Sequence, residues 1–544
     1  MTTTVVRNNL RTSRPHPLPL SRKRARGVLK QNPANLVLSL TAGAAVLLVA
    51  TASAPAADQP QWGERYSRNM VSAETGLPES FDPAAGRNVK WSIPLGGSYS
   101  TPVIAGGRVL IGCNNDEPRD PRHQGDRGVL VCLEEKTGRL CWQLVVPKLQ
   151  GDIFLDWPRA GICSPATVEG DRVYIVSNRA ELMCLDMKGL SDGNDGPYRD
   201  EGRHMGLPGE TPMEPGQLDA DILWVLDLWA DVGIHPHDSA HSSVLVHGDS
   251  LYLNTGNGVD NTHQRIRAPE APSLIVVDKQ TGRLVARDGE RIGPRIFHST
   301  WSSPALGELS GRPLVFFCGG DGVVYAFQAL TGAAASGPAE TLRRVWRFDC
   351  DPAGPKEDVH RYLRNRRESP SNIKSMPVFA GGRLYVTVGG DIWWGKEEAW
   401  LKCIDTTGTG DITDRGQAWS YPLKKHCCST PAVHGGLVFV GDCGRAFHAV
   451  DAQTGRACWT HDLDGDVWSS ALVADGKVYV GTRRGSLWVF AAGREKRLLA
   501  TIDLGDPIHG TPVAANGVLY VPTLSRLYAV GDRESSSAKE QPHE

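Results

Sequence analysis

A unit of about 40 residues recurs along this chain and limits the folds that it can adopt. Residues 428–459 show the unit whole: three short apolar runs, separated by Gly and Asp turn residues, precede a segment that ends on Trp459. Apolar runs of this length between dense turn signals predict antiparallel β-strands joined by tight turns. Pro431, Ala471 and Pro512 hold the same place in the last three copies and stand 40 and 41 residues apart. Each copy therefore predicts one four-stranded sheet.

Eight copies align on a tripeptide, typically Ser/Thr-Pro in character, that leads into the first strand of each sheet. These entries are Ser100-Thr-Pro102, Cys163-Ser-Pro165, Ser242-Ser-Val244, Ser302-Ser-Pro304, Ser375-Met-Pro377, Ser429-Thr-Pro431, Ser469-Ser-Ala471 and Gly510-Thr-Pro512. Eight radial sheets can close into a ring that has no long exposed edge. The predicted fold class is therefore all-β: an eight-bladed β-propeller of four-stranded antiparallel blades.

Two further features indicate how the ring is held together. The eighth copy stops after its third strand at Val530, so its outer strand is predicted to come from the front of the ring, at Trp91–Leu95. The pattern Thr-Gly-x-x-x-Trp occurs whole at Thr137–Trp142 and Thr454–Trp459. Because this spacing follows the strand period, we expect the indole to dock between neighbouring blades and not to hold a cofactor.

The first 57 residues differ in composition from the rest of the chain. Residues 1–34 carry eight Lys/Arg and no acid, and an apolar run from Leu36 to Ala50 and a series of small residues follow. This order is typical of a secretory signal cleaved near Ala56 or Ala57, with an uncleaved anchor as the alternative. The formal net charge is −2, and loss of those eight positive charges leaves −10. An acidic, exported protein of the periplasm or cell envelope is predicted, with no further membrane span and no affinity for nucleic acid.

Four segments are predicted along the chain. They are a signal peptide at 1–57, an irregular N-terminal segment at 58–90, the eight-bladed propeller at 91–531 and a disordered tail at 532–544. The tail is predicted from its polar, charged composition alone.

The repeat and its docking Trp resemble the pyrroloquinoline-quinone-like (PQQ-like) β-propeller repeat over about residues 91–531. That family includes the quinoprotein alcohol dehydrogenases and the propeller lipoprotein that helps to assemble outer-membrane β-barrels. The segments Pro60–Gly63, Val71–Leu77 and Leu190–Pro197 are most similar to exported propeller proteins of planctomycete bacteria, most of which have no assigned activity. The resemblance implies the fold and export, and it implies no particular reaction.

In such a propeller, the residues that enter the first strands line one mouth of the central channel, together with the loops between second and third strands. Aligning the copies brings aromatic, imidazole, thiol and charged groups to this mouth and predicts a small-ligand site, with a water-filled polar mouth as the alternative. The candidate cofactor-binding residues are Cys427, Cys428, Trp301, Trp468, Lys374, Arg159, His241 and His509. Asp238 is the nearest candidate for a catalytic base, although no motif supports it.

The adjacent Cys427 and Cys428 are the feature that most favours chemistry at this mouth. Adjacent cysteines can close a vicinal disulfide, and the resemblance implies a place for such a ring against a bound quinone. Lys374 and Arg159 would then meet the carboxylates of pyrroloquinoline quinone. Against this reading, the pair lies in the sixth copy, no Glu/Asn/Asp set for Ca²⁺ can be matched, and no Cys-x-x-Cys-His haem attachment occurs.

Metal-ligand patterns are weaker. The stretch from His235 to His241 holds three imidazoles, which would bind a metal only if the loop folded inward and a distant ligand joined them, so no metal site is assigned. Our first hypothesis is an exported scaffold without a catalytic motif that binds a protein partner or small ligand through the face carrying the long insertions. The alternative is a quinoprotein dehydrogenase that oxidises alcohols or sugars with pyrroloquinoline quinone and Ca²⁺.

Overall fold

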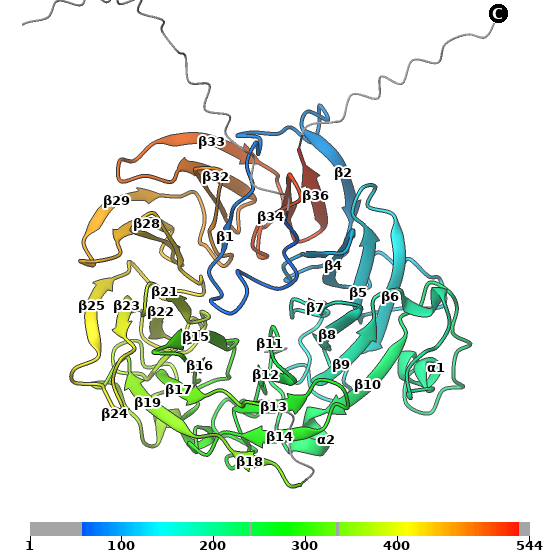
Figure 1. Ribbon diagram of the computed structural model, residues 1–544, viewed down its shortest axis with the longest axis horizontal. Coiled ribbons are helices and arrows are strands. Elements are labelled where there is room, and N and C mark those ends of the chain that lie inside the picture. The colour runs from blue at the N-terminus through cyan, green and yellow to red at the C-terminus, as the bar shows by residue number, and fades with distance from the viewer. Residues whose placement is uncertain (1–56, 239–241, 333–336, 532–544) are drawn as a thin grey trace, which may run out of the picture. The chain divides into compact units, whose positions relative to one another are not determined.

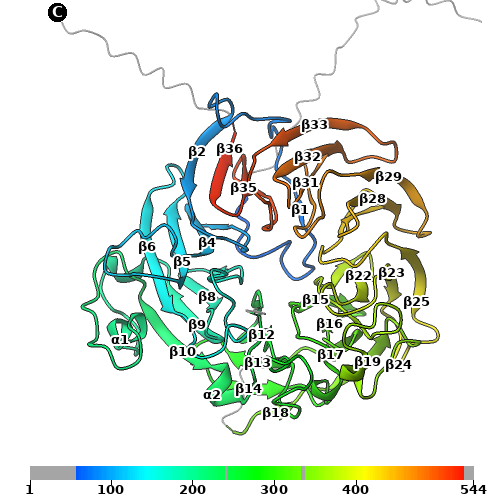
Figure 2. The ribbon, with the colours of Figure 1, turned by 180° about the vertical axis from the view of Figure 1, so that it is seen from behind.

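Eight β-sheets stand around a common axis in the computed structural model of the chain (Figure 1). The structure describes residues 57–238, 242–332 and 337–531. Consecutive strands of each sheet run antiparallel from the axis outward, so every blade is an up-and-down meander. The predicted eight-bladed propeller is therefore confirmed, and the view from behind shows the same ring (Figure 2).

The strands of each blade follow the chain in order. Blades one to four comprise β3 (Val103–Ala105), β4 (Arg108–Asn114), β5 (Arg127–Glu134), β6 (Leu140–Pro147); β7 (Thr167–Glu169), β8 (Arg172–Val176), β9 (Glu181–Asp186), β10 (Ile222–Asp227); β11 (Leu245–His247), β12 (Ser250–Asn254), β13 (Leu274–Asp278), β14 (Leu284–Arg287); and β15 (Ala305–Leu309), β16 (Arg312–Cys318), β17 (Val323–Gln328), β19 (Arg344–Asp349). Blades five to eight comprise β21 (Val378–Ala380), β22 (Arg383–Gly390), β23 (Ala399–Asp405), β25 (Gln417–Pro422); β26 (Ala432–His434), β27 (Leu437–Gly441), β28 (Ala446–Asp451), β29 (Ala457–Asp462); β30 (Leu472–Ala474), β31 (Lys477–Gly481), β32 (Ser486–Ala491), β33 (Leu498–Asp503); and β34 (Val513–Ala515), β35 (Val518–Pro522), β36 (Arg526–Val530), β2 (Val89–Pro94).

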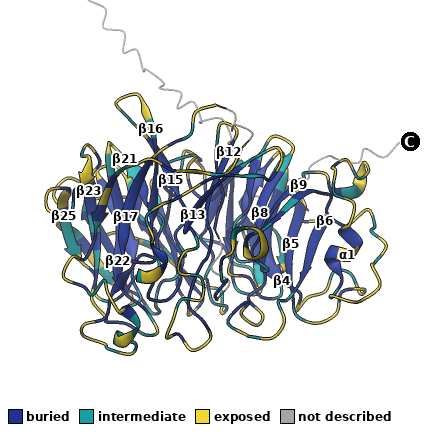
Figure 3. Cartoon of the chain, turned by 90° about the horizontal axis from the view of Figure 1, so that it is seen from below, coloured by how far each residue is buried: buried dark blue, intermediate teal, exposed yellow. Residues whose placement is uncertain are grey.

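The insertions between these strands contribute only short elements. Three two-residue strands extend blades three, four and five: β18 (Glu340–Thr341), β24 (Gly410–Asp411) and β20 (Ser371–Asn372). The described helices are α1 (Glu201–Met205), α2 (Leu228–Val232), η1 (Gly189–Ser191), η2 (Gly293–Arg295) and η3 (Val359–Tyr362). Within the described residues, none of these helices has the length or apolar character needed to cross a bilayer. Viewed edge-on, buried strands fill the interior and exposed residues gather in the loops (Figure 3).

Closure of the ring takes the predicted form. Strand β2 pairs antiparallel with β36, with Ser92 opposite Tyr528, and so supplies the outer strand that the eighth copy lacks. Strand β2 begins two residues before the predicted strand Trp91–Leu95 and ends at Pro94, one residue before Leu95. Residues from the front and the back of the propeller therefore share one sheet, which joins the first and last blades.

The Thr-Gly-x-x-x-Trp motif owes its pattern to contacts between blades. Six indoles donate their Nε1–H to a backbone carbonyl of the next blade, which confirms the predicted docking: Trp91 to Glu135, Trp142 to Met187, Trp224 to Lys279, Trp346 to Thr406, Trp419 to Ala452 and Trp459 to Gly493. The glycine of the motif receives the indole of the preceding blade. Gly138 and Gly455 have a φ of 71°, and a Cβ on either would lie within 3 Å of Trp91 or Trp419.

The segment before β2 contacts the innermost strand of every blade. It crosses near the axis of the ring, where β1 (Val71–Ser72) pairs in parallel with β30 (Figures 1 and 2). Hydrogen bonds join it to the eight blades in turn through Gln59 to Ile104, Pro60 to Val168, Arg68 to Ser243, Tyr66 to Leu306, Ser67 to Phe379, Asn69 to Val433, Met70 to Val473 and Ser72 to Ala514. The sequence did not indicate how fully this segment is bonded to the blades.

This segment lies at one end of the ring only. The amide of Gly106, in the turn between the first and second strands of blade one, donates to Asp58 at 2.8 Å, and Gly517 in blade eight donates to Glu74 at 2.7 Å. First strands start at the opposite end, after the entry residues. We call the end with these turns the closed end. The entry face is the other end, formed by the residues before the first strands and by the loops between second and third strands.

Arg68 anchors the segment to residues that precede the first strands of blades three and four. Its side chain has no exposure, and its guanidinium donates to the carbonyls of Pro304, Trp62 and Ser243 and to the Ser243 hydroxyl at 2.9–3.2 Å. Burial lowers the pKa of Arg68 to about 9, so the group stays charged at neutral pH. No acid among the described residues pairs with this buried cation, so it depends on these four acceptors to offset its lost hydration.

Replacing this guanidinium should therefore destabilise the propeller. We expect Arg68→Ala to lower the free energy of unfolding by about 3–5 kcal/mol, because it leaves three buried carbonyls without a donor and opens a cavity. Arg65→Ala is the matched control, since the Arg65 side chain is 60% exposed and lies 3.8 Å from Glu169; it should change that free energy by less than about 0.5 kcal/mol. Urea unfolding followed by Trp fluorescence measures both. Equal midpoints for wild type and Arg68→Ala would contradict this role.

Candidate functional site

A chain of aromatic rings crosses the entry face. Tyr99 packs on His509 at 4.8 Å between ring centroids, His509 on Trp468 at 5.5 Å, Trp468 on Trp393 at 6.0 Å and Trp393 on Trp301 at 6.2 Å. Four of these rings precede the first strands of blades one, four, seven and eight, and Trp393 lies in the loop between β22 and β23. The structure thus brings together Tyr99, Trp301, Trp468 and His509, as the alignment of the copies predicts.

Cations cover two of these rings. The Lys374 ammonium lies 4.4 Å from the centre of the Trp301 ring, and the Arg483 guanidinium lies 4.3 Å from that of Trp468. Burial first, and then Arg483, lower the pKa of His509 to about 4, so this imidazole is neutral at pH 7. The predicted Lys374 therefore does reach the aromatic chain, and Arg483, from the loop between β31 and β32, adds a cation that the alignment did not indicate.

Asp391 organises this part of the face. It is fully buried. Its Oδ2 accepts hydrogen bonds from Lys374 Nζ at 2.8 Å, from Asn372 Nδ2 at 3.1 Å and from His298 Nδ1 at 3.1 Å. Its Oδ1 accepts from the amides of Trp393 and Trp394. Burial opposes ionisation, but Lys374 and His298 hold the pKa of Asp391 well below its usual range. One carboxylate thus fixes the lysine, the histidine and the loop of the two tryptophans.

Sequence reasoning missed Asp391, although a signal for it exists. Three copies place an aspartate after a glycine directly beyond the second strand, at Asp321, Asp391 and Asp442, and all three are buried. An acid at a repeated position just beyond a strand is a candidate for a buried hydrogen-bond acceptor. The partners of Asp391 include His298 from another blade, which the repeat alone could not identify.

Beside Asp391 lies a group of three imidazoles and a carboxylate, which we call the histidine cluster: His237, Asp238, His263 and His298. His298 Nε2 lies 3.2 Å from both His237 Nε2 and Asp238 Oδ2, and His237 Nε2 lies 3.6 Å from Asp238 Oδ2. All three imidazoles are buried. Burial lowers the pKa of His237 to about 3, whereas Asp391 and Asp238 raise the pKa of His298 despite its burial.

The histidine cluster joins the predicted Asp238 to His263 and His298, which the sequence did not assign to a metal site. His263 comes from the loop between β12 and β13, and His298 precedes β15. No metal was assigned from the sequence because the stretch around His237 showed no distant ligand. His263 and His298 are such distant ligands, and the fold brings them close to His237. His241, predicted at the same mouth, lies outside the described residues.

Arg159 does not join the site. Its side chain is 77% exposed and lies 4.0 Å from Asp116, while its backbone carbonyl accepts from Asn114. The residue adopts a φ of 58°, and its amide donates to Asp126. The turn that follows blade one therefore directs this cation outward and away from the aromatic chain.

The adjacent cysteines do not form a ring. Both Cys427 and Cys428 are free, as are the other ten cysteines. Cys427 is buried in the apolar core around β22, β23 and β27, and its thiol donates to the carbonyl of Gly441 at 3.1 Å. Burial raises the pKa of the Cys427 thiol, whereas a hydrogen bond with Cys428 raises the pKa of the Cys443 thiol, so Cys428 is directed toward Cys443. The vicinal disulfide considered from the sequence is thus not present.

These positions bear on whether pyrroloquinoline quinone fits. A flat quinone needs an open ring face to lie against, yet the Lys374 ammonium covers the face of Trp301 and Trp393 packs beside it. Cys427 points into a core instead of toward the aromatic chain, and Arg159 points to solvent. The residues predicted to hold the quinone therefore do not fit it in this arrangement.

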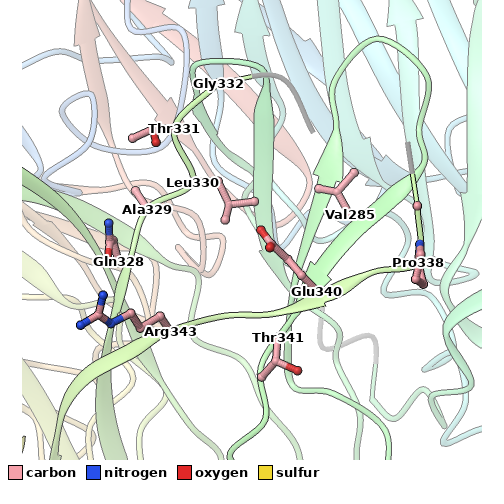
Figure 4. A pocket seen from close by; sticks show the side chains of 11 residues that line it. Val285, Gln328, Ala329, Leu330, Thr331, Gly332, Pro338, Glu340, Thr341 and Arg343 are labelled. Carbon is pink, nitrogen blue, oxygen red and sulfur yellow. The ribbon is translucent and has the colours of Figure 1, made fainter. Parts of the chain in front are cut away.

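Two hollows lie elsewhere on the molecule. A cavity of about 550 Å³ lies beside the outer strands β14 and β18, lined among others by Val285, Glu340 and Arg343 (Figure 4). It is remote from the aromatic chain and holds no cluster of titratable groups. A second hollow, of about 410 Å³, lies on the entry face between Leu149, Arg179 and Trp229.

Comparison with known proteins places the chain in a family. A PQQ-like family model described as outer membrane protein assembly factor BamB matches residues 74–335 and 397–498, more than half of the sequence. The chain belongs to this family. The resemblance to the PQQ-like repeat that the sequence indicated is thereby confirmed.

Two solved quinohemoprotein structures share the fold of this chain at low sequence identity. Quinohemoprotein alcohol dehydrogenase from Comamonas testosteroni is 12% identical, with a TM-score of 0.53, over 90% of this chain and 83% of its own. The quinohemoprotein alcohol dehydrogenase ADHIIG from Pseudomonas putida HK5 is also 12% identical, with a TM-score of 0.53, over 89% and 82%. BamB from Moraxella catarrhalis is 14% identical, with a TM-score of 0.49, over 82% and 99%. No curated protein matches the chain. At these identities the likeness establishes the fold alone.

The thiol arrangement makes a direct prediction. The unreduced peptide that carries Cys427 and Cys428 should have the mass of two free thiols, and Cys427 should react with iodoacetamide only after unfolding, because it is a buried thiol and not a thiolate. Cys141 serves as the reactive control, since its hydrogen bond with Cys132 lowers its pKa to about 6 and it is only partly buried. A peptide mass lower by two hydrogens would contradict the structure and indicate a disulfide between Cys427 and Cys428.

Proposed function

We propose that this protein is an exported binding scaffold that holds a protein partner on its entry face. The observation that carries the proposal is the distribution of exposed apolar side chains. Among the described residues, seven large apolar side chains are exposed, and five lie in loops of the entry face: Tyr99, Ile153, Trp157, Trp229 and Trp393. Exposed aromatic groups gathered on one face favour a recognition surface, since Trp and Tyr supply much of the energy of protein interfaces.

Two further features support a partner of this kind. The hollow beside Trp229 is lined by Leu149, Arg179, Asp227 and Ala230, which provides a concave place for an anchoring side chain. The family model bears the description of an outer membrane protein assembly factor, and this likeness favours a protein as the partner. Because the N-terminal segment already occupies the closed end through eight sets of hydrogen bonds, the entry face is the end that we assign to binding.

We do not favour the quinoprotein dehydrogenase. Its support from the sequence rested on Cys427 with Cys428 and on cations free to meet carboxylates, whereas Lys374 is held by Asp391 at 2.8 Å and Arg159 points outward. Turnover of an alcohol or sugar by the purified protein after addition of pyrroloquinoline quinone and Ca²⁺ would contradict our preference.

Two matched double variants test partner binding. Trp157→Ser with Trp229→Ser removes two exposed rings from the entry face, and Leu218→Ser with Leu498→Ser removes two exposed leucines from other parts of the surface. A partner recovered by cross-linking in the native cells should be retained by the leucine variant and should bind the tryptophan variant at least tenfold more weakly in a purified binding assay. Equal affinity for both variants would show that the partner does not use this face.

Export rests on the first 57 residues, which combine eight basic residues, an apolar run and a series of small residues. The expected outcome of secretion in a bacterial host is a mature chain whose N-terminus, read by sequencing, follows Ala56 or Ala57. A full-length chain that remains in the cytoplasmic fraction would contradict export, and a full-length chain in the membrane fraction would identify an anchor.

A further inference from the structure

We infer that the histidine cluster (His237, Asp238, His263 and His298) binds one divalent transition-metal ion, with zinc the best match to its donors. Three imidazoles and one carboxylate offer one ligand atom each, and all four atoms lie within 4.8 Å of one another. Imidazole nitrogen with a single carboxylate is a donor set suited to zinc and related ions and is poorly suited to Ca²⁺ or Mg²⁺. This inference concerns the entry face but does not depend on partner binding.

The spacing of three donor atoms agrees with a tetrahedral ion. At zinc–ligand bonds of 2.0–2.2 Å, two ligands of a tetrahedron stand about 3.3–3.6 Å apart. The three separations among His237 Nε2, His298 Nε2 and Asp238 Oδ2 are 3.2, 3.2 and 3.6 Å. One ion could therefore contact all three atoms, and His263 stands close enough to provide the fourth ligand.

A second layer of contacts fixes the orientation of the ligands. His298 presents Nε2 to the cluster because its Nδ1 is held by Asp391 at 3.1 Å, and Asp391 is itself held by Lys374 and Asn372. A carboxylate behind a histidine in this way is a common support of metal-bound imidazole. Phe154 stacks parallel to His237 at 5.8 Å and meets His263 edge-on at 4.8 Å, so apolar surface surrounds the donors.

The charges also favour a cation. Asp391 is paired with Lys374, and Asp238 is the carboxylate that faces the imidazoles. Among the residues that the structure describes, the buried Oδ1 atom of Asp238 has no hydrogen-bond partner. A hydrogen-bonded network of His237, His298 and Asp238 is the alternative that needs no metal, and it predicts no metal uptake.

A second group of potential ligands provides a contrast. Asp120, His123 and Asp219 also bring three ligand atoms within 4.8 Å of one another. There, however, the guanidinium of Arg122 donates to both Asp120, at 2.5 Å, and Asp219, at 3.1 Å. A guanidinium already donates to both of those carboxylates, so we assign no metal to them. The contrast supplies a control histidine.

Zinc titration of tag-free, full-length protein tests the inference. After treatment with EDTA and dialysis, wild-type protein should take up one equivalent of Zn²⁺ by calorimetry and by elemental analysis, and its Tm should rise by a few degrees. Co²⁺ should bind in place of Zn²⁺ and give the visible absorption of a tetrahedral site, which reports the ligand set directly. Wild-type protein that takes up no metal under these conditions would overturn the inference.

Variants assign the site to its residues. His298→Ala and His263→Ala should abolish stoichiometric uptake and the Co²⁺ spectrum, whereas His123→Ala and His509→Ala should retain both. Asp391→Asn should weaken binding by about 10–100-fold while the tetrahedral Co²⁺ spectrum persists, as expected of a positioning residue. Uptake that survives His298→Ala, or that is lost with His123→Ala, would contradict the assignment. Circular dichroism verifies that each variant folds. If His298→Ala does not fold, His263→Ala decides the question, because His263 lies in a loop.

Discussion

The pairing of β2 with β36 is the constraint on which the rest of the molecule depends. A propeller blade exposes both faces of its sheet and needs a neighbour on each side, so the ring must close for every blade to be buried. Here the closing contact joins residues 434 positions apart, as between Arg526 and Ser92. Once the ring is closed, six indoles link neighbouring blades at their outer strands, and Arg68 ties the N-terminal segment across the innermost strands. The same segment that leads into β2 thus secures the ring at its edge and near its axis.

This closure gives the two ends of the propeller different roles. At the closed end, backbone groups of the first strands are bonded to residues 59–72 and leave little of the inner surface for a ligand. At the entry face, the long links between blades bring aromatic, cationic and imidazole groups together around Asp391. Loops on a rigid scaffold are where binding residues collect, because they vary without disturbing the packed sheets. The asymmetry between the ends follows from chain direction, since every first strand starts at the entry face.

How much of this the sequence could predict depends on the kind of contact. The repeat, the eight blades, the closing strand and the docking tryptophans all follow from spacing, because each is tied to a strand period that can be read along the chain. The position of Tyr99, Trp301, Trp468 and His509 at one mouth follows from the same alignment. The all-round contacts of residues 59–72 could not be predicted, because most are backbone hydrogen bonds that leave no residue pattern. The histidine cluster was not predicted as a group for a different reason: His263 lies in the loop between β12 and β13, away from the aligned entry residues, so the alignment does not bring it to His298. The vicinal disulfide considered for Cys427 and Cys428 is wrong because side chains that are adjacent in sequence need not lie at the same site. Cys427 packs into the core.

The central claim is that the histidine cluster on the entry face forms a metal-binding site. Crystallography at the zinc absorption edge tests it most directly. Diffraction from zinc-loaded crystals measured on both sides of the edge should give a single strong anomalous peak about 2.0–2.2 Å from His237 Nε2, His298 Nε2 and Asp238 Oδ2. The map should also show His298 Nδ1 still held by Asp391. No anomalous peak among these four residues, or a peak beside His123 instead, would contradict the account.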